Sequence, residues 1–248
     1  MPGAERPAVL CIGGLDPSAG AGLLADAEAV WAAGARPLCA ATAVTIQSRK
    51  GVRGFELLSP QLVLSQVAVL LEDEKPAAVK LGMLGNSAMA FALGAVLRHR
   101  VKAPIVVDPV LRSSSGATLF SGNARRGYEP LFSLGPILTP NVVEAERLTG
   151  AGAVTGKAEM EAVADRVLAL GCRAVVLKGG HLEGKRSPDY VLDAKKGQWL
   201  AGTRLRGTAR GTGCRFASAL AAKLALGESL VDSARFAKAY VRRAFAGR

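Results

Sequence analysis

A short glycine-rich stretch near the carboxyl terminus has the composition of an anion site. Residues 211–214 read Gly-Thr-Gly-Cys, and Phe216 and Leu220 follow at helical spacing. Glycine lets a backbone approach a ligand closely, and the free N–H groups of a helix N-terminus favour phosphate. The stretch therefore predicts either an anion cradle, built on the N–H groups of Gly213 and Cys214, or a strand-to-helix loop without a ligand.

The elements that would position this stretch alternate between short apolar strands and amphipathic helices. Strands are predicted over residues 8–12, 37–46, 77–81, 104–107, 136–139 and 173–177. Helices are predicted over residues 23–33, from 59–60 onward, from Asn86 or Ser87 to 99, from 141 onward, over 159–170, and in two final segments, the last over 229–248. Only residues 190–193 and 198–200 break the alternation, as an antiparallel hairpin. Because parallel neighbours need crossovers, the pattern predicts one α/β domain over residues 1–248, with a mostly parallel sheet between helices on both faces.

Polar and small residues follow the predicted strands. Since the loops after parallel strands share one edge of a sheet, they are expected to converge there. These residues are Gly14, Asp26, Gln47, Met83, Asp108, Asn141, Glu144, Lys178 and Cys214. An anion cradle, a lysine and carboxylates suit phosphoryl transfer, which needs positioning and charge neutralisation. No Walker, GxSxG or GxGxxG motif occurs, which argues against P-loop, serine hydrolase and dinucleotide sites.

Charge and hydropathy narrow the class of protein. The formal net charge is +12, and after residue 200 ten Lys or Arg face two acids. Such a segment suits an anionic small substrate or forms a solvated helix face, while aromatic residues at 5% are too few for nucleic acid. No apolar run reaches the ~20 residues of a membrane span, and residues 1–7 lack a signal-peptide pattern. A cytoplasmic protein with no membrane or nucleic-acid partner is expected.

Four cysteines lie far apart, with no CxxC pair, which argues against a zinc site or a disulfide framework. Cys11, Cys39 and Cys172 lie in or beside apolar runs and are expected to be buried. Cys214 differs, because a helix N-terminus lowers the pKa of a thiol.

Seven segments in this order resemble a known family. They are residues 14–22 (GLDPSAGAG) with Asp26, 45–47 (TIQ), 80–84 (KLGML), 108–110 (DPV), 139–141 (TPN) with Glu144, 176–181 (VLKGGH) and 211–214 (GTGC). Together they are similar to the hydroxymethylpyrimidine and hydroxymethylpyrimidine-phosphate kinases of thiamine biosynthesis, in the ribokinase-like superfamily. The resemblance implies a three-layer αβα fold, the use of ATP and Mg²⁺, and a homodimer.

The resemblance also implies roles for individual residues. A pyrimidine pocket would be lined by Gly14, Asp26, Thr45, Gln47, Met83 and Val110, with Asp26 and Gln47 bonding the ring and its amino group. ATP would contact Asn141, Lys178 and Thr212, and Mg²⁺ would be held by Glu144 and Asp108. Catalysis would fall to Gly211, Thr212, Gly213 and Cys214. Cys214 would either accept the proton of the acceptor as a thiolate or position the acceptor hydroxyl or the substrate phosphate.

The sequence departs from the family at a few positions. Arg210 and Arg215 replace a histidine before and a threonine after the glycine motif, and Glu28 replaces a lysine. The arginines are expected to keep or add positive charge near the phosphate, and Glu28 leaves the substrate preference open. The family's glycine- and histidine-bearing tail has no counterpart after Arg248, so altered closure of the nucleotide site is expected.

Three functions remain in competition. The first is a kinase that phosphorylates hydroxymethylpyrimidine and then its monophosphate. The second is a pyridoxal or pyridoxine kinase, whose ring also carries a hydroxymethyl group, although Gln47 and Met83 favour the pyrimidine. The third is a non-catalytic pyrimidine-binding regulator, against which the presence of Asn141, Glu144 and Lys178 argues.

Overall fold

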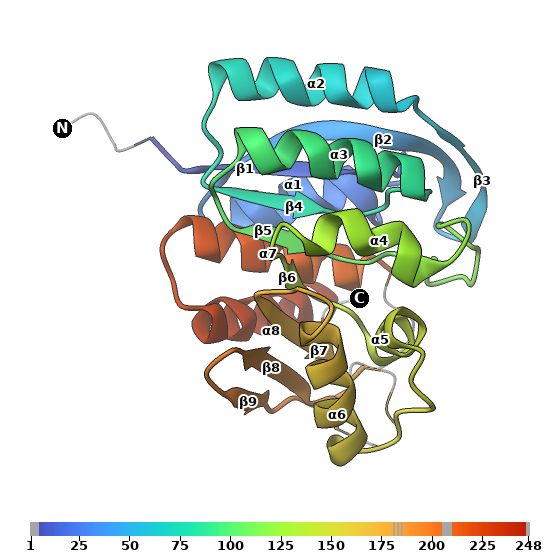
Figure 1. The fold of residues 1–248 in the computed structure, drawn as a ribbon, viewed down its shortest axis with the longest axis vertical. Helices are drawn as coiled ribbons and strands as arrows, with labels where there is room; N and C mark the ends of the chain where they lie inside the picture. Colours follow the sequence, from blue (N-terminus) through green and yellow to red (C-terminus); the bar gives the residue numbers. More distant parts are fainter. Residues whose placement is uncertain (1–4, 181, 183, 185, 205–209, 247–248) are drawn as a thin grey trace.

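One nine-stranded sheet runs through the described part of the chain, in the order β3-β2-β1-β4-β5-β6-β7-β8-β9 (Figure 1). The computed structural model describes residues 5–180, 182, 184, 186–204 and 210–246. The strands are β1 (Ala8–Leu15), β2 (Arg36–Ser48), β3 (Gly51–Leu57), β4 (Ala78–Leu81), β5 (Ile105–Val107), β6 (Ile137–Leu138), β7 (Ala174–Lys178), β8 (Asp189–Asp193) and β9 (Gly197–Leu200). The helices are α1 (Gly22–Ala32), α2 (Pro60–Asp73), α3 (Ser87–Arg100), α4 (Ala124–Phe132), α5 (Val142–Thr149), α6 (Lys157–Leu168), α7 (Thr212–Ala225) and α8 (Leu230–Ala246).

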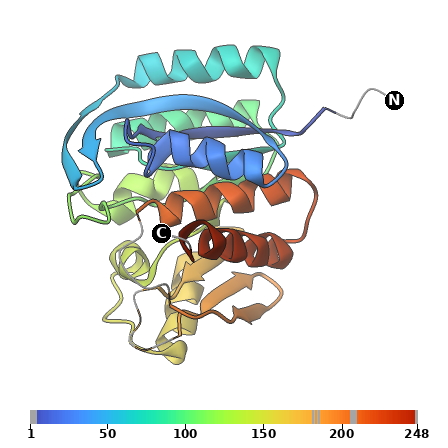
Figure 2. The ribbon, with the colours of Figure 1, turned by 180° about the vertical axis from the view of Figure 1, so that it is seen from behind.

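Two layers of helices cover the sheet. Helices α2 to α6 pack on one face, where Val63, Leu93 and Leu131 share one apolar core (Figure 1). Helices α1, α7 and α8 pack on the other face, where Ala29 and Leu220 belong to a second core (Figure 2). The predicted three-layer αβα, ribokinase-like fold is therefore confirmed. The organisation of residues 1–248 as one domain stays a prediction, which the continuity of the sheet supports.

The direction of the parallel strands places the loops that follow them at one edge of the sheet. Strands β1, β2, β4, β5, β6 and β7 run parallel, while β3, β8 and β9 are antiparallel to their neighbours. The central strands read as continuous apolar runs because helices bury them on both sides. Their carboxyl ends therefore meet at a single edge, and the predicted hairpin is present as β8 and β9.

Local sequence signals fix several helix starts on the side that faces this edge. Asn86 caps α3 through the N–H of Met89 at 3.0 Å. Asn141 caps α5 through the N–H of Glu144 at 2.9 Å, and Glu144 returns a bond to the N–H of Asn141 at 2.8 Å. This capping box rigidly orients both side chains. None of the described helices is long and apolar enough to cross a membrane.

Some elements differ from the sequence prediction. Helix α4 was not predicted, because Gly127 and Pro130 are poor helix formers, and β3 carries two glycines that obscure the strand pattern. Strand β2 runs on to Ser48, so Gln47 lies within the strand and not beyond it. Cys39 is exposed, contrary to expectation, because it points to the opposite side of β2 from the buried Ala40. The predicted helix end at Arg248 and the predicted motif residue His181 lie outside the described residues.

Candidate active site

A cavity of about 1390 Å³ lies at the edge where the parallel strands end. Its lining comes from the loops after β1, β4, β5, β6 and β7, from the end of β2, and from the starts of α5 and α7. All of the residues predicted for the site line this one cavity: Gly14, Asp26, Thr45, Gln47, Met83, Asp108, Val110, Asn141, Glu144, Lys178, Gly211, Thr212, Gly213 and Cys214. The structure thus brings together groups that are spread over two hundred residues of sequence.

The start of α7 has the geometry expected of an anion cradle. Gly211 occupies the N-cap position with φ 68°, a left-handed conformation that favours glycine, and no side chain caps the helix. A Cβ on Gly213 would lie 3.2 Å from both the Oδ2 of Asp108 and the Nζ of Lys178. The uncapped N–H groups of the first turn therefore open onto a small space bordered by one cation and one carboxylate.

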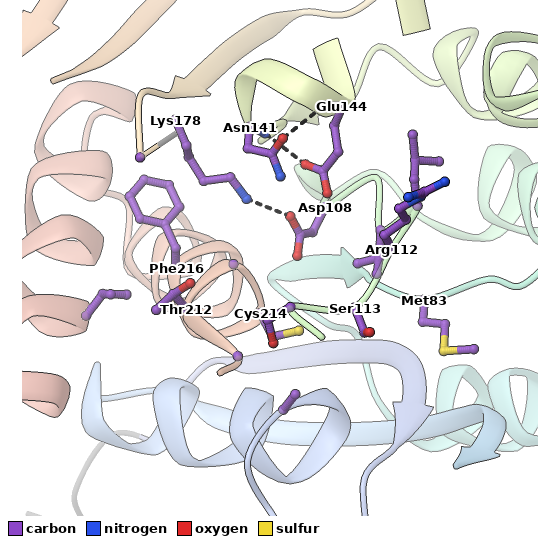
Figure 3. A pocket seen from close by; sticks show the side chains of 18 of the residues that line it. Met83, Asp108, Arg112, Ser113, Asn141, Glu144, Lys178, Thr212, Cys214 and Phe216 are labelled. Carbon is purple, nitrogen blue, oxygen red and sulfur yellow. Dashed lines mark hydrogen bonds and ion pairs between the residues drawn. The ribbon is translucent and has the colours of Figure 1, made fainter. Parts of the chain in front are cut away.

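Lys178 and Asp108 face each other across this space (Figure 3). The Nζ of Lys178, at the end of β7, donates to the Oδ1 of Asp108, just after β5, at 2.9 Å. Burial alone would lower the pKa of Lys178, but the carboxylates of Asp108 and Glu144 outweigh it and the pKa is raised. The lysine is therefore a fixed positive charge beside the cradle.

Glu144 supplies the second carboxylate of this region. Burial raises the pKa of its carboxyl to about 7, against the opposing charge of Lys178. In the described part of the chain, no three His, Cys, Asp or Glu side chains cluster closely enough to hold a metal ion alone. Mg²⁺, however, is commonly bound by one or two carboxylates together with substrate phosphates. Asp108 and Glu144 beside an anion cradle fit such a phosphate-bridged ion.

The other end of the cavity has an apolar wall and a polar strand edge. Met83 packs with Ala43 and Leu119, and Val110 lies against this cluster. A Cβ on Gly14 would lie 3.0 Å from the sulfur of Met83, so glycine keeps this wall in place.

Two polar side chains that line the cavity, Thr45 and Gln47, follow Ala43 of this wall along β2 at every second residue. The Thr45 hydroxyl lies 3.1 Å from the Oε1 of Gln47 and 3.0 Å from the carbonyl oxygen of Leu15. An oriented amide that shares a cavity with apolar side chains suits a flat heteroaromatic ring that carries hydrogen-bonding groups.

Asp26 lies deeper than its predicted role requires. It is fully buried, with the Nζ of Lys80 at 2.7 Å from its Oδ2 and the hydroxyl of Ser218 at 2.8 Å from its Oδ1. Asp26 lies beyond the first turn of α1, so its carboxylate does not serve as a partner of the helix dipole. Burial tends to lower the pKa of Lys80, but the Asp26 carboxylate outweighs it and that pKa is raised, whereas burial raises the pKa of Asp26 despite the Lys80 ammonium. The 2.7 Å contact between two unexposed side chains is that of a buried ion pair. Contact between Asp26 and the substrate stays a prediction.

The expected activation of Cys214 is wrong. Burial raises the pKa of its thiol to about 11, and the nearby Lys80 ammonium offsets this only in part. The helix N-terminus is too weak to reverse the cost of burying a thiolate. Cys214 is therefore a neutral thiol at physiological pH.

The departures Arg210, Arg215 and Glu28 are paired with one another or with Asp16, and their effect on anion binding and on substrate preference stays a prediction. Arg210 pairs with Asp16 at 2.8 Å, and Arg215 pairs with Glu28 at 2.7 Å. None of the three side chains lines the cavity. The arginines therefore add no free positive charge to the cradle, and the reversed charge of Glu28 is answered by Arg215.

Comparison with known proteins decides the family. The profile of the phosphomethylpyrimidine kinase family matches residues 16–248. The chain belongs to this family. Membership makes it a phosphotransferase. That the start of α7, Lys178 and the two carboxylates carry out this chemistry stays a prediction.

Similar proteins show how far the match extends. The chain is 37% identical to the thiamine biosynthesis bifunctional protein ThiED of Geobacter sulfurreducens over 96% of its own length, but it spans only 49% of that longer protein. It is 35% identical to the hydroxymethylpyrimidine/phosphomethylpyrimidine kinase of Rhizobium meliloti, covering 95% of this chain and 89% of that one.

Two solved structures are similar as well. The phosphomethylpyrimidine kinase of Clostridium difficile superposes with a TM-score of 0.82 at 32% identity, covering 96% of this chain and 99% of that chain. The pyridoxal kinase of Staphylococcus aureus, solved with pyridoxal, superposes with a TM-score of 0.89 at 28% identity, and the match covers 97% of this chain and 88% of that chain.

Sequence reasoning missed several residues of this kinase's cavity. Lys80 was quoted only as part of a motif, although a lysine inside the apolar run of β4 is itself a signal of a buried charge with a partner. Leu119 completes the apolar wall, and Lys238 of α8 pairs with Asp189 of β8 at 2.7 Å where both line the cavity. No local pattern marks Leu119 or Lys238, because only the fold brings them to the site.

Proposed function

We propose that this kinase transfers the γ-phosphoryl group of ATP to 4-amino-5-hydroxymethyl-2-methylpyrimidine and then to its monophosphate, in thiamine biosynthesis. One observation carries the proposal. A single cavity holds the Gly211–Cys214 cradle with the Lys178–Asp108 pair at one end and the Gln47–Met83 pocket at the other. An acceptor ring in the pocket would direct its hydroxymethyl group toward the cradle.

The residues divide the work of phosphoryl transfer. The N–H groups of Gly213 and Cys214 bind the oxygens of the transferring group, and Lys178 neutralises charge on the phosphates of ATP beside Asn141 and Thr212. Asp108 and Glu144 would hold Mg²⁺, which would supply charge neutralisation to the phosphates of ATP. Gly14, Thr45, Gln47, Met83 and Val110 hold the ring, and Asp26 supports the floor beneath it.

Cys214 contributes by position. A thiol with a pKa of about 11 is a poor proton acceptor at neutral pH. A loose transition state needs little help from a base, because bond formation to the acceptor lags behind bond breaking. The thiol therefore orients the acceptor hydroxyl, or the phosphate of the monophosphate in the second transfer.

A pyridoxal kinase activity is the second candidate. The similarity to the Staphylococcus aureus pyridoxal kinase over 97% of this chain favours it. The match to the phosphomethylpyrimidine kinase profile and to the named pyrimidine kinases favours the pyrimidine more strongly. A regulator without activity is set aside, since Asn141, Glu144 and Lys178 all line the cavity. The homodimer, the cytoplasmic location and the absence of nucleic-acid and membrane partners stay predictions.

The release of ADP tests this function. Purified protein with ATP and Mg²⁺ is offered the pyrimidine, its monophosphate and pyridoxal in parallel. We expect ADP with the first two at rates well above that with pyridoxal, and a loss of at least a hundredfold in Lys178→Met. Lys223→Met, on the far part of α7 and outside the cavity, serves as the control. Equal or higher turnover of pyridoxal would favour the second candidate, and no ADP with any acceptor would refute both.

A further inference from the structure

Two arginines on either side of the cradle both reach across to the β1–α1 loop, residues 16–21. The Nη2 of Arg210 donates to the Oδ2 of Asp16 at 2.8 Å. Its Nη1 donates to the carbonyl oxygen of Ser48 at 2.5 Å and lies 3.4 Å from the hydroxyl of Ser18. One guanidinium thus ties the start of the β1–α1 loop to the end of β2, on the amino-terminal side of the cradle.

Arg215 makes a second attachment from the other side. Its side chain is only 2% exposed. Its Nη1 donates to the carbonyl oxygen of Gly20 at 2.8 Å, and its Nη2 donates to that of Ala19 at 3.3 Å and to the Oε2 of Glu28 at 2.7 Å. The buried guanidinium therefore holds two consecutive carbonyl groups of the loop and the first helix after it.

The loop and the cradle interlock where these arginines meet them. A Cβ on Gly211 would lie 2.2 Å from the carbonyl oxygen of Gly20, so the two backbones touch directly. Ala19 has φ 55°, and it is the one residue other than glycine with positive φ in the described part of the chain. An L-residue resists this conformation, so the turn that presents both carbonyl groups to Arg215 needs outside contacts to hold it.

The β1–α1 loop carries groups that reach the reacting end of the cavity. Asp16 and Ala21 line the cavity, and the N–H of Gly22, the residue after the loop, donates to the thiol of Cys214. Arg210, Arg215 and Glu28 do not line it. The arginines therefore act on the chemistry through the backbone that they hold, and not by contact with a ligand in the cavity.

We propose that Arg210 and Arg215 are positioning residues that clamp the β1–α1 loop onto the anion cradle and so set the distance between the acceptor and the transferring phosphoryl group. Asp16 and Glu28 neutralise the two guanidinium groups, which therefore do not act as phosphate ligands. The catalytic consequence rests on the proposed kinase function, whereas the structural consequence rests on the contacts alone.

Kinetics separate positioning from simple stabilisation. The variants are Arg210→Met, Arg215→Met, Arg215→Lys and Glu28→Gln. The control is Lys223→Met. Lys223 lies in α7, the helix that also carries Arg215, and its Nζ pairs with the Oε1 of Glu228 at 2.9 Å. We expect kcat to fall at least tenfold in both methionine variants of the clamp, with the KM for ATP changed less than twofold.

The conservative variants sharpen this comparison. Arg215→Lys should recover part of the loss, because a lysine keeps the charge opposite Glu28 but cannot bond both carbonyl groups. The kcat of Glu28→Gln should fall less than that of Arg215→Met, and the kcat of Lys223→Met should not change.

Hydrogen exchange supplies a readout that needs no activity. The N–H of Ala19 bonds the carbonyl oxygen of Asp16 at 3.0 Å, and the N–H of Ala21 bonds its carboxylate at 3.0 Å. We expect peptides over residues 16–22 to exchange at least tenfold faster in Arg210→Met and Arg215→Met, with the exchange of α7 beyond its first turn unchanged.

Each outcome has a distinct meaning. Unchanged exchange in residues 16–22, or rates that fall only in proportion to unfolded protein, would overturn the clamp. If Arg215→Met does not fold, Arg210→Met, whose side chain is more exposed than that of Arg215, decides. If the wild-type protein transfers no phosphoryl group, the kinase proposal fails while the exchange experiment still decides the clamp.

Discussion

The ammonium of Lys178 and the carboxylate of Asp108 lie 2.9 Å apart, directly beside the place that a side chain on Gly213 would fill. The pair joins β7 to β5 across the sheet and leaves the cradle open above it. Glycine at position 213 therefore keeps this space clear beside the two charged groups, and no positive φ requires it there.

The first prediction concerns this space. Gly213→Ala places a methyl group 3.2 Å from both charged groups, so it should obstruct the transferring phosphoryl group. We expect kcat/KM for ATP to fall about tenfold, or about 1.4 kcal/mol, with the thermal stability unchanged. Steady-state kinetics check this, with Gly152→Ala, which has nothing within 4 Å, as the control. Equal activity in the two variants would show that the space is not used.

The second prediction concerns the junction of cradle and loop. Gly211 and Gly150 both have φ 68°, but a Cβ on Gly150 would meet nothing within 4 Å, whereas one on Gly211 would lie 2.2 Å from the carbonyl oxygen of Gly20. We expect Gly150→Ala to lose about 1 kcal/mol from backbone strain alone and Gly211→Ala to lose about 2–4 kcal/mol. Denaturant unfolding measures both losses. Equal losses would contradict the close contact between the two backbones.

The third prediction concerns the buried pair beneath the cavity. Lys80→Met leaves the Asp26 carboxylate without its cation in a site with no exposure, so we expect a loss of about 3–5 kcal/mol in the free energy of unfolding. The double variant Lys80→Met/Asp26→Leu should recover part of that loss. Arg235→Met, which breaks an exposed pair with Asp232, is the control and should change stability little. A Lys80→Met variant as stable as this control would show that the pair is not ionised.

The fourth prediction follows from Glu144. Its pKa is raised from the ordinary 4.5 to about 7 by burial, so between these values the folded state binds more protons than the unfolded state. The free energy of unfolding should therefore fall as pH rises from about 4.5 to 7, by up to about 3 kcal/mol from this group.

Glu144→Gln isolates this contribution, since glutamine preserves the capping box with Asn141 but does not titrate. In metal-free buffer the free energy of unfolding of the wild type should fall relative to that of the variant as the pH rises across this window. Parallel pH profiles for the two proteins would contradict the raised pKa.

Much of this arrangement was predictable from local signals. Apolar runs ending in Asp108 or Lys178 predicted strand ends, and parallel strands bring their ends to one edge. The cap residues Asn86 and Asn141 were correctly placed, because a cap depends only on its own helix.

The remainder depends on distant partners. The neutral thiol of Cys214 follows from burial that only the fold creates, and the partner of Arg215, Glu28, lies 187 residues away in sequence. Helix α4 forms despite Gly127 and Pro130 because Tyr128 and Leu131 pack into the core, which outweighs weak helix propensity.

The most direct test of the proposed function follows the phosphoryl group itself. Wild-type protein is incubated with ATP, Mg²⁺ and hydroxymethylpyrimidine, and phosphorus NMR and mass spectrometry follow the products. The account predicts first a phosphate ester on the hydroxymethyl oxygen and then a diphosphate on the same oxygen, with one ADP formed at each step. ATP that stays intact, or a phosphate that is transferred to pyridoxal and not to the pyrimidine, would contradict it.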